Sequence, residues 1–407
     1  MTSRSALQGI TVLDMSRVLA GPSSTQLLGD LGAEVIKVER RGVGDETRTW
    51  GPPYMKGAEG DDSGESAYYL SANRNKRSIT VDISKPEGVA LIRRMLAKSD
   101  VLIENLKVGG MAKYGLSYDD LKTDFPGLVY CSITGYGQTG PYAPRPGYDM
   151  MAQGLGGLIS MTGEPGRLPV KVPIAVNDVM TGMYAAVAIL AALRHRDATG
   201  EGQHIDLGLL DVQVGWLYNQ GMNYLIGGTI PERLGTAHPN SVPYQAFETK
   251  DGFVIMGANN DDQFRRFCEL AGEPDLARDP RFATNPDRVK NRDAIVAKVQ
   301  EILRRRTSAE WIEDLSAASL PVCPINDLEQ VFADPHVQAR GMKISMPHGA
   351  AGGQPVDMIG NPIKMSGTPV SYRRPPPTLG EHTDEVLNDV FGLSQDEVAR
   401  LRADEII

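Results

Sequence analysis

The sequence predicts an α/β protein with a parallel sheet. Short runs of branched and aliphatic residues alternate with segments whose apolar residues recur at the helical period. The first strand, helix and second strand together take about 30 residues, which is the length of a βαβ unit. With 407 residues, of which 41% are hydrophobic, the chain is long enough to bury a large core and to hold more than one domain.

The first half of the chain supplies the expected sheet. Ser23 and Ser24 can cap the first helix, Gly32 ends it, and Pro86 begins another. Long loops rich in Gly and Pro are expected at residues 42–66 and 134–149. Strands are expected at residues 9–15, 33–39, 79–82, 101–104, 128–133 and 203–207. Helices are expected at residues 25–31, 86–97, 121–125, from 150 onward, and from Asp178 to 195.

The pattern changes after residue 207. Residues 209–224 are apolar and helical, and residues 244–249 and 253–257 predict a hairpin that turns at Asp251–Gly252. Further helices are expected at residues 261–271, 292–305, 308–317 and 394–403. We therefore expect a large α/β domain at residues 1–207, a small α+β domain at 225–330, and linkers at 208–224 and 331–340.

Charge and composition limit the class of protein. The formal net charge is -9 and the pI is about 5.3, so general nucleic-acid binding is not expected, although a local basic pocket could hold a phosphorylated ligand. The beginning of the chain does not resemble a secretory signal, and the apolar stretch at residues 183–193 is too short to span a bilayer. The three cysteines are scattered, which favours a reducing compartment. We expect a cytoplasmic protein that binds neither nucleic acid nor membrane.

Several well-known catalytic and cofactor-binding motifs are absent, which reduces the number of reaction types to consider. The chain has no P-loop, H-E-x-x-H, G-x-S-x-G or kinase signature, and its first strand–helix turn lacks G-x-G-x-x-G. Its six histidines do not have metal-ligand spacing. We therefore expect no metal site and no nicotinamide or flavin cofactor. A His-dependent hydrolase stays open, although nothing pairs a His with a Ser or Cys.

The most informative stretch surrounds Asp178. An apolar run of strand character at residues 173–176 precedes Asn177 and Asp178, and a helical pattern with Gly182 one turn on follows them. A carboxylate at a helix N-terminus can act as a nucleophile toward a thioester, and backbone N–H groups there can stabilise the oxyanion. Asp is also favoured as a plain helix N-cap, and this stretch alone does not separate the two interpretations.

Basic residues beside strands are candidate phosphate ligands. Arg40 follows the second expected strand, at the sheet edge where ligands gather in open α/β folds. The basic cluster at residues 73–78 either contacts phosphates or forms a solvated turn, and both interpretations stay open.

Blocks along the whole chain resemble the class III CoA-transferases, the family of formyl-CoA transferase and carnitine CoA-transferase. The matching blocks lie at residues 13–14, 20–22, 31–39, 75–78, 100–105, 147–149, 178–182, 199–203 and 379–385. Within the family, residues 47–53, 130–141 and 242–247 are especially similar to the succinyl-CoA-dependent glutarate (hydroxymethylglutarate) CoA-transferases.

The resemblance implies an interlocked homodimer. Each subunit would have a large Rossmann-like domain, completed by residues 341–407, and a small middle domain. It places the nucleophile on Asp178 and implies acyl-CoA and carboxylic acid substrates without a metal or redox cofactor. Contacts to CoA are implied for Arg17, Leu19, Ala20, Arg40, Val81, Asn105, Leu106, Lys107, Lys113, Tyr114 and Tyr148. The family's glycine-rich lid loop has no clear copy, since residues 236–240 occupy the corresponding region.

The expected reaction is a ping-pong transfer. Asp178 would attack a donor such as succinyl-CoA, and an aspartyl anhydride and then an aspartyl-CoA thioester would form before the acceptor, for instance glutarate, enters. Candidates for binding a second carboxylate are Arg48, Arg145, Arg233 and His238.

Three alternatives remain. A formyl-CoA:oxalate-type transferase shares the chemistry. An α-methylacyl-CoA racemase shares the fold and uses a His and an Asp as bases, but the residue before Asp149 is Tyr148, a poor base at neutral pH. A non-catalytic CoA-binding protein is the third.

Overall fold

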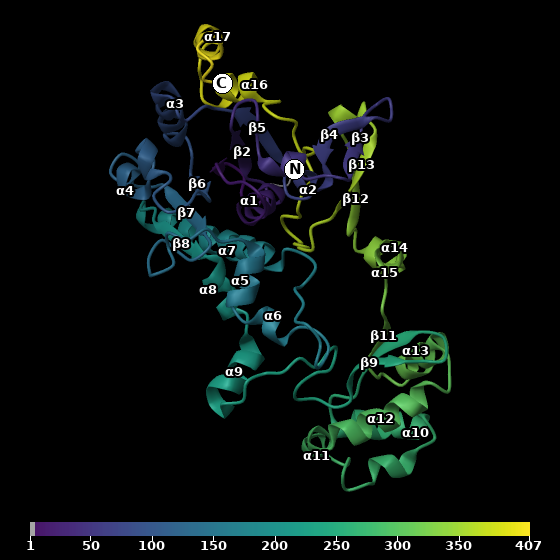
Figure 1. Ribbon diagram of the computed structural model, residues 1–407. Helices are drawn as coiled ribbons and strands as arrows, with labels where there is room; N and C mark the ends of the chain where they lie inside the picture. Colours follow the sequence, from purple (N-terminus) through teal and green to yellow (C-terminus); the bar gives the residue numbers. More distant parts are fainter. Residues whose placement is uncertain (1–4) are drawn as a thin grey trace. The chain divides into compact units, whose positions relative to one another are not determined.

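The computed structural model describes residues 5–407 and shows that the chain divides into two compact units (Figure 1). The sheet unit holds residues up to Leu158, Val172–Asn219 and Pro335–Ile407. The hairpin unit holds Ile159–Lys171 and Gln220–Asp334. Residues 159–171 thus group with the hairpin unit, although they lie within the range expected for the large domain, and residues 208–224 are divided between the two units.

The sheet unit is built on six parallel strands in the order β5-β2-β1-β6-β7-β8. The strands are β1 Thr11–Asp14, β2 Glu34–Glu39, β5 Lys76–Thr80, β6 Val101–Glu104, β7 Val129–Thr134 and β8 His204–Gly208. The predicted parallel α/β sheet is therefore confirmed. The strand order reverses between β1 and β6, and ligands of such sheets bind at this point, beyond the carboxyl ends of the strands.

Helices cover both faces of the sheet, because successive strand residues point to opposite sides. Val12 packs with Leu28 of α1 and Ile189 of α7 on one face, whereas Leu13 packs with Met95 of α3 and Val398 of α17 on the other. These helices are α1 Ala20–Asp30, α3 Pro86–Leu96, α7 Val176–Thr199 and α17 Gln395–Ala403. The C-terminal elements lie beside α3 and β5 in Figure 1, so the end of the chain completes this unit.

Helix α7 is long and apolar enough to cross a membrane by length and composition. However, 56% of its most apolar window is buried, and its buried residues belong to the core between α1 and the sheet. It is therefore a core helix of the sheet unit.

The hairpin unit has its own core. Strands β9 Tyr244–Glu248 and β10 Phe253–Gly257 form the predicted antiparallel hairpin, and β11 Val322–Pro324 joins β10. The apolar faces of the surrounding helices cover this sheet. These helices are α10 Asp261–Leu270, α11 Asn285–Lys290, α12 Arg292–Leu303 and α13 Ser308–Ala317.

Several local predictions were wrong. Residues 173–176 form no strand, since residues 173–175 are irregular and α7 begins at Val176. The helix expected from residue 25 begins at Ala20, so Ser23 and Ser24 lie inside it instead of capping it. Residues 42–66 contain η1 Glu46–Thr49 and a small hairpin of β3 Tyr54–Lys56 and β4 Asp62–Ser66. The helical pattern at 209–224 is interrupted, forming α8 Leu209–Gly215 and α9 Tyr218–Gly227.

Shorter elements complete the two units. They are α2 Ala67–Leu70, α4 Tyr118–Leu121, α5 Asp149–Leu155, α6 Leu158–Met161, α14 Leu328–Ala333, α15 Pro335–Ala339, β12 Lys343–Pro347, β13 Pro355–Ile359 and α16 Thr383–Glu385.

Candidate active site

A cavity of about 210 Å³ opens beyond the carboxyl ends of the central strands, and Asp178 lies on its wall. Its walls come from the turn after β1, the turn after β6, the loop after β7 and the first turn of α7. We call it the Asp178 cavity. Of the predicted site residues it brings together Arg17, Leu19, Ala20, Asn105, Leu106, Lys107, Arg145, Tyr148 and Asp178.

Asp178 is not a helix N-cap. Ala175 holds the N-cap position of α7 and its side chain makes no capping hydrogen bond. Instead, an oxygen of Asp149 accepts hydrogen bonds from the backbone N–H groups of Asn177, at 2.8 Å, and Asp178, at 3.3 Å. Asp149, 29 residues earlier in the chain, therefore caps the helix and leaves the Asp178 carboxylate free for another role.

The surroundings of Asp178 disfavour its ionised form. Burial is the main cause and the nearby Asp149 carboxylate the second, and together they raise the pKa of Asp178 to about 7. A perturbed carboxyl on a cavity wall is typical of a functional residue. Burial, Asp178 and Asp149 also raise the pKa of Tyr68 to about 12, so this phenol stays neutral at physiological pH. Sequence reasoning missed the capping role of Asp149 at this site.

The first turn of α1 borders the same cavity. Leu19 holds the N-cap position without a side-chain capping bond, and Ala20 begins the helix beside the cavity. Gly182 lets α7 lie against this turn, since a Cβ there would be 2.2 Å from the Ser23 hydroxyl oxygen. The uncapped N-terminus of α1 thus presents amide dipoles, with their positive end, to a cavity that contains a carboxylate.

The turn between β1 and α1 is held in a strained shape. Val18 has a φ of 69°, which is uncommon for a β-branched residue. The Asn105 side chain binds the backbone of Arg17 through two hydrogen bonds, of 2.9 and 2.7 Å. The N–H of Val18 donates to the carboxylate of Asp45 at 3.3 Å. These contacts hold Arg17 and Val18 in a fixed position on the wall of the Asp178 cavity.

A second cavity of about 500 Å³ adjoins the first and shares Arg17, Glu46 and Leu106 with it. We call it the Arg40 cavity. It also contains the predicted CoA contacts Arg40, Val81 and Tyr114. Lys113 lines neither cavity, so its predicted contact with CoA stays a prediction.

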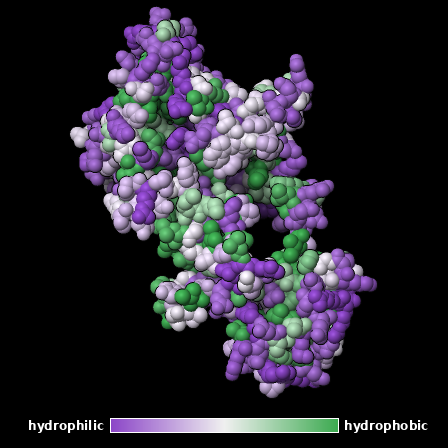
Figure 2. All heavy atoms as spheres, viewed as in Figure 1, coloured by the Kyte–Doolittle hydropathy of each residue, from purple (hydrophilic) through white to green (hydrophobic). Residues whose placement is uncertain are grey.

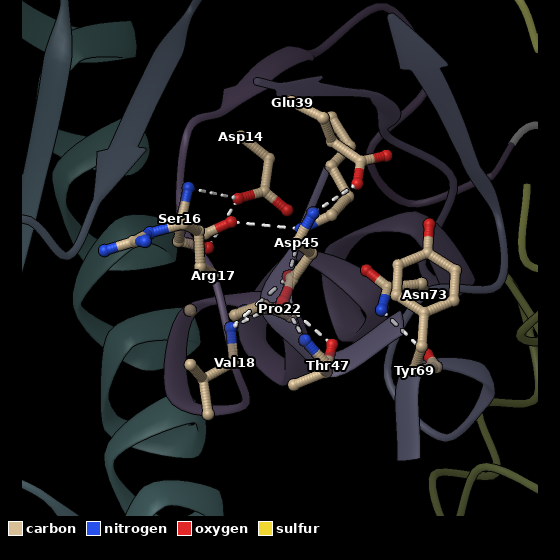
Figure 3. A network of polar contacts seen from close by, with 12 residues as sticks. Asp14, Ser16, Arg17, Val18, Pro22, Glu39, Asp45, Thr47, Tyr69 and Asn73 are labelled. Carbon is tan, nitrogen blue, oxygen red and sulfur yellow. Dashed lines mark hydrogen bonds and ion pairs between the residues drawn. The ribbon is translucent and has the colours of Figure 1, made fainter. Parts of the chain in front are cut away.

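Beneath the cavities lies a buried network of charges (Figure 3). Asp14 accepts from Lys76 at 3.1 Å, from Thr25 at 2.6 Å and from Ser16 at 2.5 Å, and all these side chains are buried. Lys37 pairs with Asp45 at 2.9 Å, and Asp45 in turn holds Val18 and Thr47. The network therefore supports the strained turn from below.

The basic cluster at 73–78 is part of this interior, so both interpretations of it were wrong. Arg74 pairs with Asp30, Lys76 with Asp14 and Arg77 with Glu34. The pattern appeared solvated because its acidic partners are distant in the sequence.

Arg48 is also structural. Arg48 is 5% exposed, and its guanidinium donates to Glu39, Glu65, Tyr69 and the Pro377 carbonyl, so its donors are occupied. It does not line the Asp178 cavity. We therefore withdraw it as a ligand of a substrate carboxylate. His238 lies in the hairpin unit, where its ring stacks on Tyr244, and its role stays a prediction.

Glu104, at the end of β6, is a further buried acid beside the site. It is 4% exposed, accepts from the Leu106 backbone N–H at 2.8 Å and bonds to Ser132, whose hydroxyl lies 3.0 Å from His204 Nε2. Burial raises the pKa of Glu104 to about 7, and the bonds from Ser132 and Leu106 only partly oppose this shift. Glu104 thus holds the peptide of Leu106, which borders both cavities.

Replacing Glu104 by Gln is expected to stabilise the protein at high pH. The wild-type acid stabilises the fold most when it is protonated, and this contribution is lost as pH rises from about 4.5 through 7. At pH 8 the free energy of unfolding of E104Q should exceed that of the wild type by roughly 2–3 kcal/mol. At pH 4 the two should agree. Urea unfolding at both pH values measures the difference, with Glu59→Gln in an exposed loop as control; parallel pH profiles would contradict the assignment.

Comparison with known proteins shows the family to which this chain belongs. The model of CoA-transferase family III matches residues 7–383. The chain belongs to this family. The enzyme is therefore a CoA-transferase. In the part of the chain that the structure describes, His, Cys, Asp and Glu side chains form no group of three that could hold a metal ion.

Three similar proteins cover nearly the whole chain. The enzyme is 49% identical to a succinate–glutarate CoA-transferase of Agrobacterium fabrum, over 94% of this chain and 95% of the relative. It is 43% identical to the human succinyl-CoA:glutarate CoA-transferase, over 96% and 87% of the two chains. The crystal structure of a CAIB/BAIF family protein from Brucella suis is 46% identical, has a TM-score of 0.83, and is matched over 95% of this chain and 99% of that one.

Proposed function

We propose that the enzyme transfers CoA from succinyl-CoA to glutarate or a closely related dicarboxylic acid, with Asp178 as the nucleophile. The observation that carries this proposal is a free carboxylate of raised pKa on the wall of the Asp178 cavity, which the uncapped N-terminal end of α1 also lines. Two relatives at 43–49% identity, named for succinate or succinyl-CoA and glutarate, support the choice of substrates.

The proposed mechanism is ping-pong. The Asp178 carboxylate attacks the thioester carbonyl of succinyl-CoA, the C–S bond breaks, and CoA leaves as thiolate, so that Asp178 and the succinyl group form a mixed anhydride. The thiolate attacks the aspartyl carbonyl and releases succinate, which leaves an aspartyl-CoA thioester. Glutarate then attacks this thioester, and the same two steps in reverse give glutaryl-CoA and free Asp178.

Backbone donors for the oxyanion come from α1 in this proposal. Asp149 already occupies the N–H groups of Asn177 and Asp178, so the helix that carries the nucleophile cannot offer them. The N-terminus of α1 lies on the same cavity without a side-chain cap. Its amides would stabilise the negative charge that develops on the attacked carbonyl oxygen.

The adjoining cavities fit the two halves of CoA. The larger Arg40 cavity would hold the nucleotide, where Arg40 supplies positive charge. The pantetheine arm would pass Leu106, which borders both cavities, and bring the thioester to Asp178. CoA would enter as a substrate, and no redox cofactor takes part in these steps.

An interlocked homodimer is part of the proposal. Val179, Met183 and Val187 lie four residues apart on α7 and are 37%, 52% and 65% exposed, so they form an exposed apolar stripe along the helix. Apolar side chains also gather on the surface over α5 and α8 (Figure 2). A second subunit would cover these faces. Light scattering coupled to size exclusion measures the expected dimer mass.

Transfer itself is tested with the purified enzyme, succinyl-CoA and a panel of acids that includes glutarate, oxalate and propionate. We expect mass spectrometry to show glutaryl-CoA as the main product. Preferred formation of oxalyl-CoA would favour a formyl-CoA:oxalate-type enzyme instead. Deuterium uptake at the α-carbon of a 2-methylacyl-CoA in D₂O, without transfer to any acid, would overturn the proposal in favour of a racemase.

A further inference from the structure

We propose that Arg145 binds the remote carboxylate of the transferred acyl group and thereby makes the enzyme selective for dicarboxylic acids. This role rests on the CoA transfer proposed above. A five-carbon dicarboxylic acid presents one carboxyl to Asp178 and keeps the other several bonds away. An unpaired cation on the wall of the same cavity is the chemistry that would recognise it.

Only one of the four predicted carboxylate ligands lines the Asp178 cavity, and it is Arg145. Arg48 is buried and its donors are occupied. Arg233 and His238 belong to the hairpin unit, where Arg233 donates to the Ser160 carbonyl and His238 accepts from Asn240.

Aromatic rings and glycines hold Arg145 in place before any ligand binds. Its guanidinium lies over the Tyr142 ring, 3.8 Å from the centroid, and Tyr142 packs edge-on against Tyr136 with centroids 5.8 Å apart. At the base of the loop Gly147 touches Gly135, since a Cβ on Gly147 would be 2.4 Å from the Gly135 Cα. A cation that is ordered in advance loses less entropy when it binds its ligand.

The guanidinium of Arg145 has no acceptor among residues 5–407, whereas the other arginine on the wall, Arg17, pairs with Glu46 at 2.7 Å. Arginine offers two parallel N–H donors, which match the two oxygens of a carboxylate. The loop that carries Arg145 runs directly into Asp149, whose carboxylate binds the Asp178 backbone N–H at 3.3 Å. Arg145 is therefore linked to Asp178 through residues 145–149 and the hydrogen bond from the Asp178 backbone to Asp149.

Lys107 is the other cation on this wall without an acidic partner among the described residues. It follows Leu106, which borders both cavities, and this position suits a contact with CoA itself. Because CoA is common to every substrate, a contact from Lys107 would not select among acids. Arg145, on the opposite loop after β7, does not border the Arg40 cavity.

The test is a competition between glutarate and pentanoate, which has the same chain length but lacks the second carboxylate. With succinyl-CoA as donor, the ratio of glutaryl-CoA to pentanoyl-CoA reports the ratio of the two kcat/KM values. We expect Arg145→Gln to lower this ratio about 10- to 100-fold, which is the effect of losing a charged hydrogen-bonded pair. Arg145→Lys should lower it less, because the charge remains while the paired geometry is lost.

Arg281→Gln is the matched control. This arginine also stacks on an aromatic ring, 5.0 Å from the centroid of Phe282, but it lies in the hairpin unit and should leave the ratio unchanged. An equal loss with both acids in Arg145→Gln would overturn the role, as would a change of ratio in Lys107→Gln alone. A wild-type enzyme that transfers CoA to no acid would overturn the proposed function itself, and with it this role.

Discussion

Replacing Asp178 by Asn is expected to lower the rate of CoA transfer at least about 10⁴-fold. An amide has nearly the size of the carboxylate but cannot form the anhydride, so the covalent route is closed. The fold should persist, because the Asp178 side chain makes no hydrogen bond or ion pair with the described residues. Removing a buried charge beside Asp149 should also leave the protein at least as stable as the wild type at pH 8.

The pH dependence of the wild type provides a second measure of the same role. The reactive form is the carboxylate and its pKa is raised to about 7, so kcat/KM should rise with pH and level off above 7. Asp62→Asn at an exposed ion pair is the control and should behave like the wild type. Initial rates with succinyl-CoA and glutarate measure both effects. More than a tenth of wild-type turnover in pure D178N would exclude Asp178 as the nucleophile.

Replacing Asp14 by Asn is expected to have the largest effect on stability, a loss of about 3–5 kcal/mol in the free energy of unfolding. Asp14 and Lys76 are both fully buried, and the charge of Lys37 lies close enough to lower the pKa of Asp14. Without the Asp14 carboxylate, the ammonium groups of Lys76 and Lys37 remain buried, and less negative charge is left to balance them. The strained turn at Val18 depends on the same network, so affinity for succinyl-CoA should fall as well.

Urea unfolding at pH 7 measures this loss. Asp62→Asn is the control, because its ion pair with Lys56 is exposed and should contribute less than about 1 kcal/mol. The double variant Asp14→Asn, Lys76→Met removes the charges of both partners and should regain part of the loss. Folding lowers the pKa of Asp14 to about 2, so its contribution is present above pH 4 and disappears as the pH falls toward 2. Equal losses in D14N and D62N would contradict a role for the buried network.

The fold could be predicted from the sequence because its strands carry a local pattern. Residues 33–39 and 101–104 are branched and apolar, since a parallel strand is covered on both faces. The hairpin at 244–257 followed from the turn at Asp251–Gly252 in the same way. Boundaries were less certain, as the early starts of α1 and α7 show.

The sequence by itself singled out Asp178, the family and several of the residues on the two cavities, because these depend on residue types at positions that a family shares. Only the tertiary structure decided what those side chains do. Asp149 caps α7 and helps to raise the pKa of Asp178, Arg48 is occupied by Glu39 and Glu65, and Arg145 alone of the four candidate cations lines the Asp178 cavity. Each of these outcomes depends on burial and on partners brought together by folding, and a local pattern of residues contains neither.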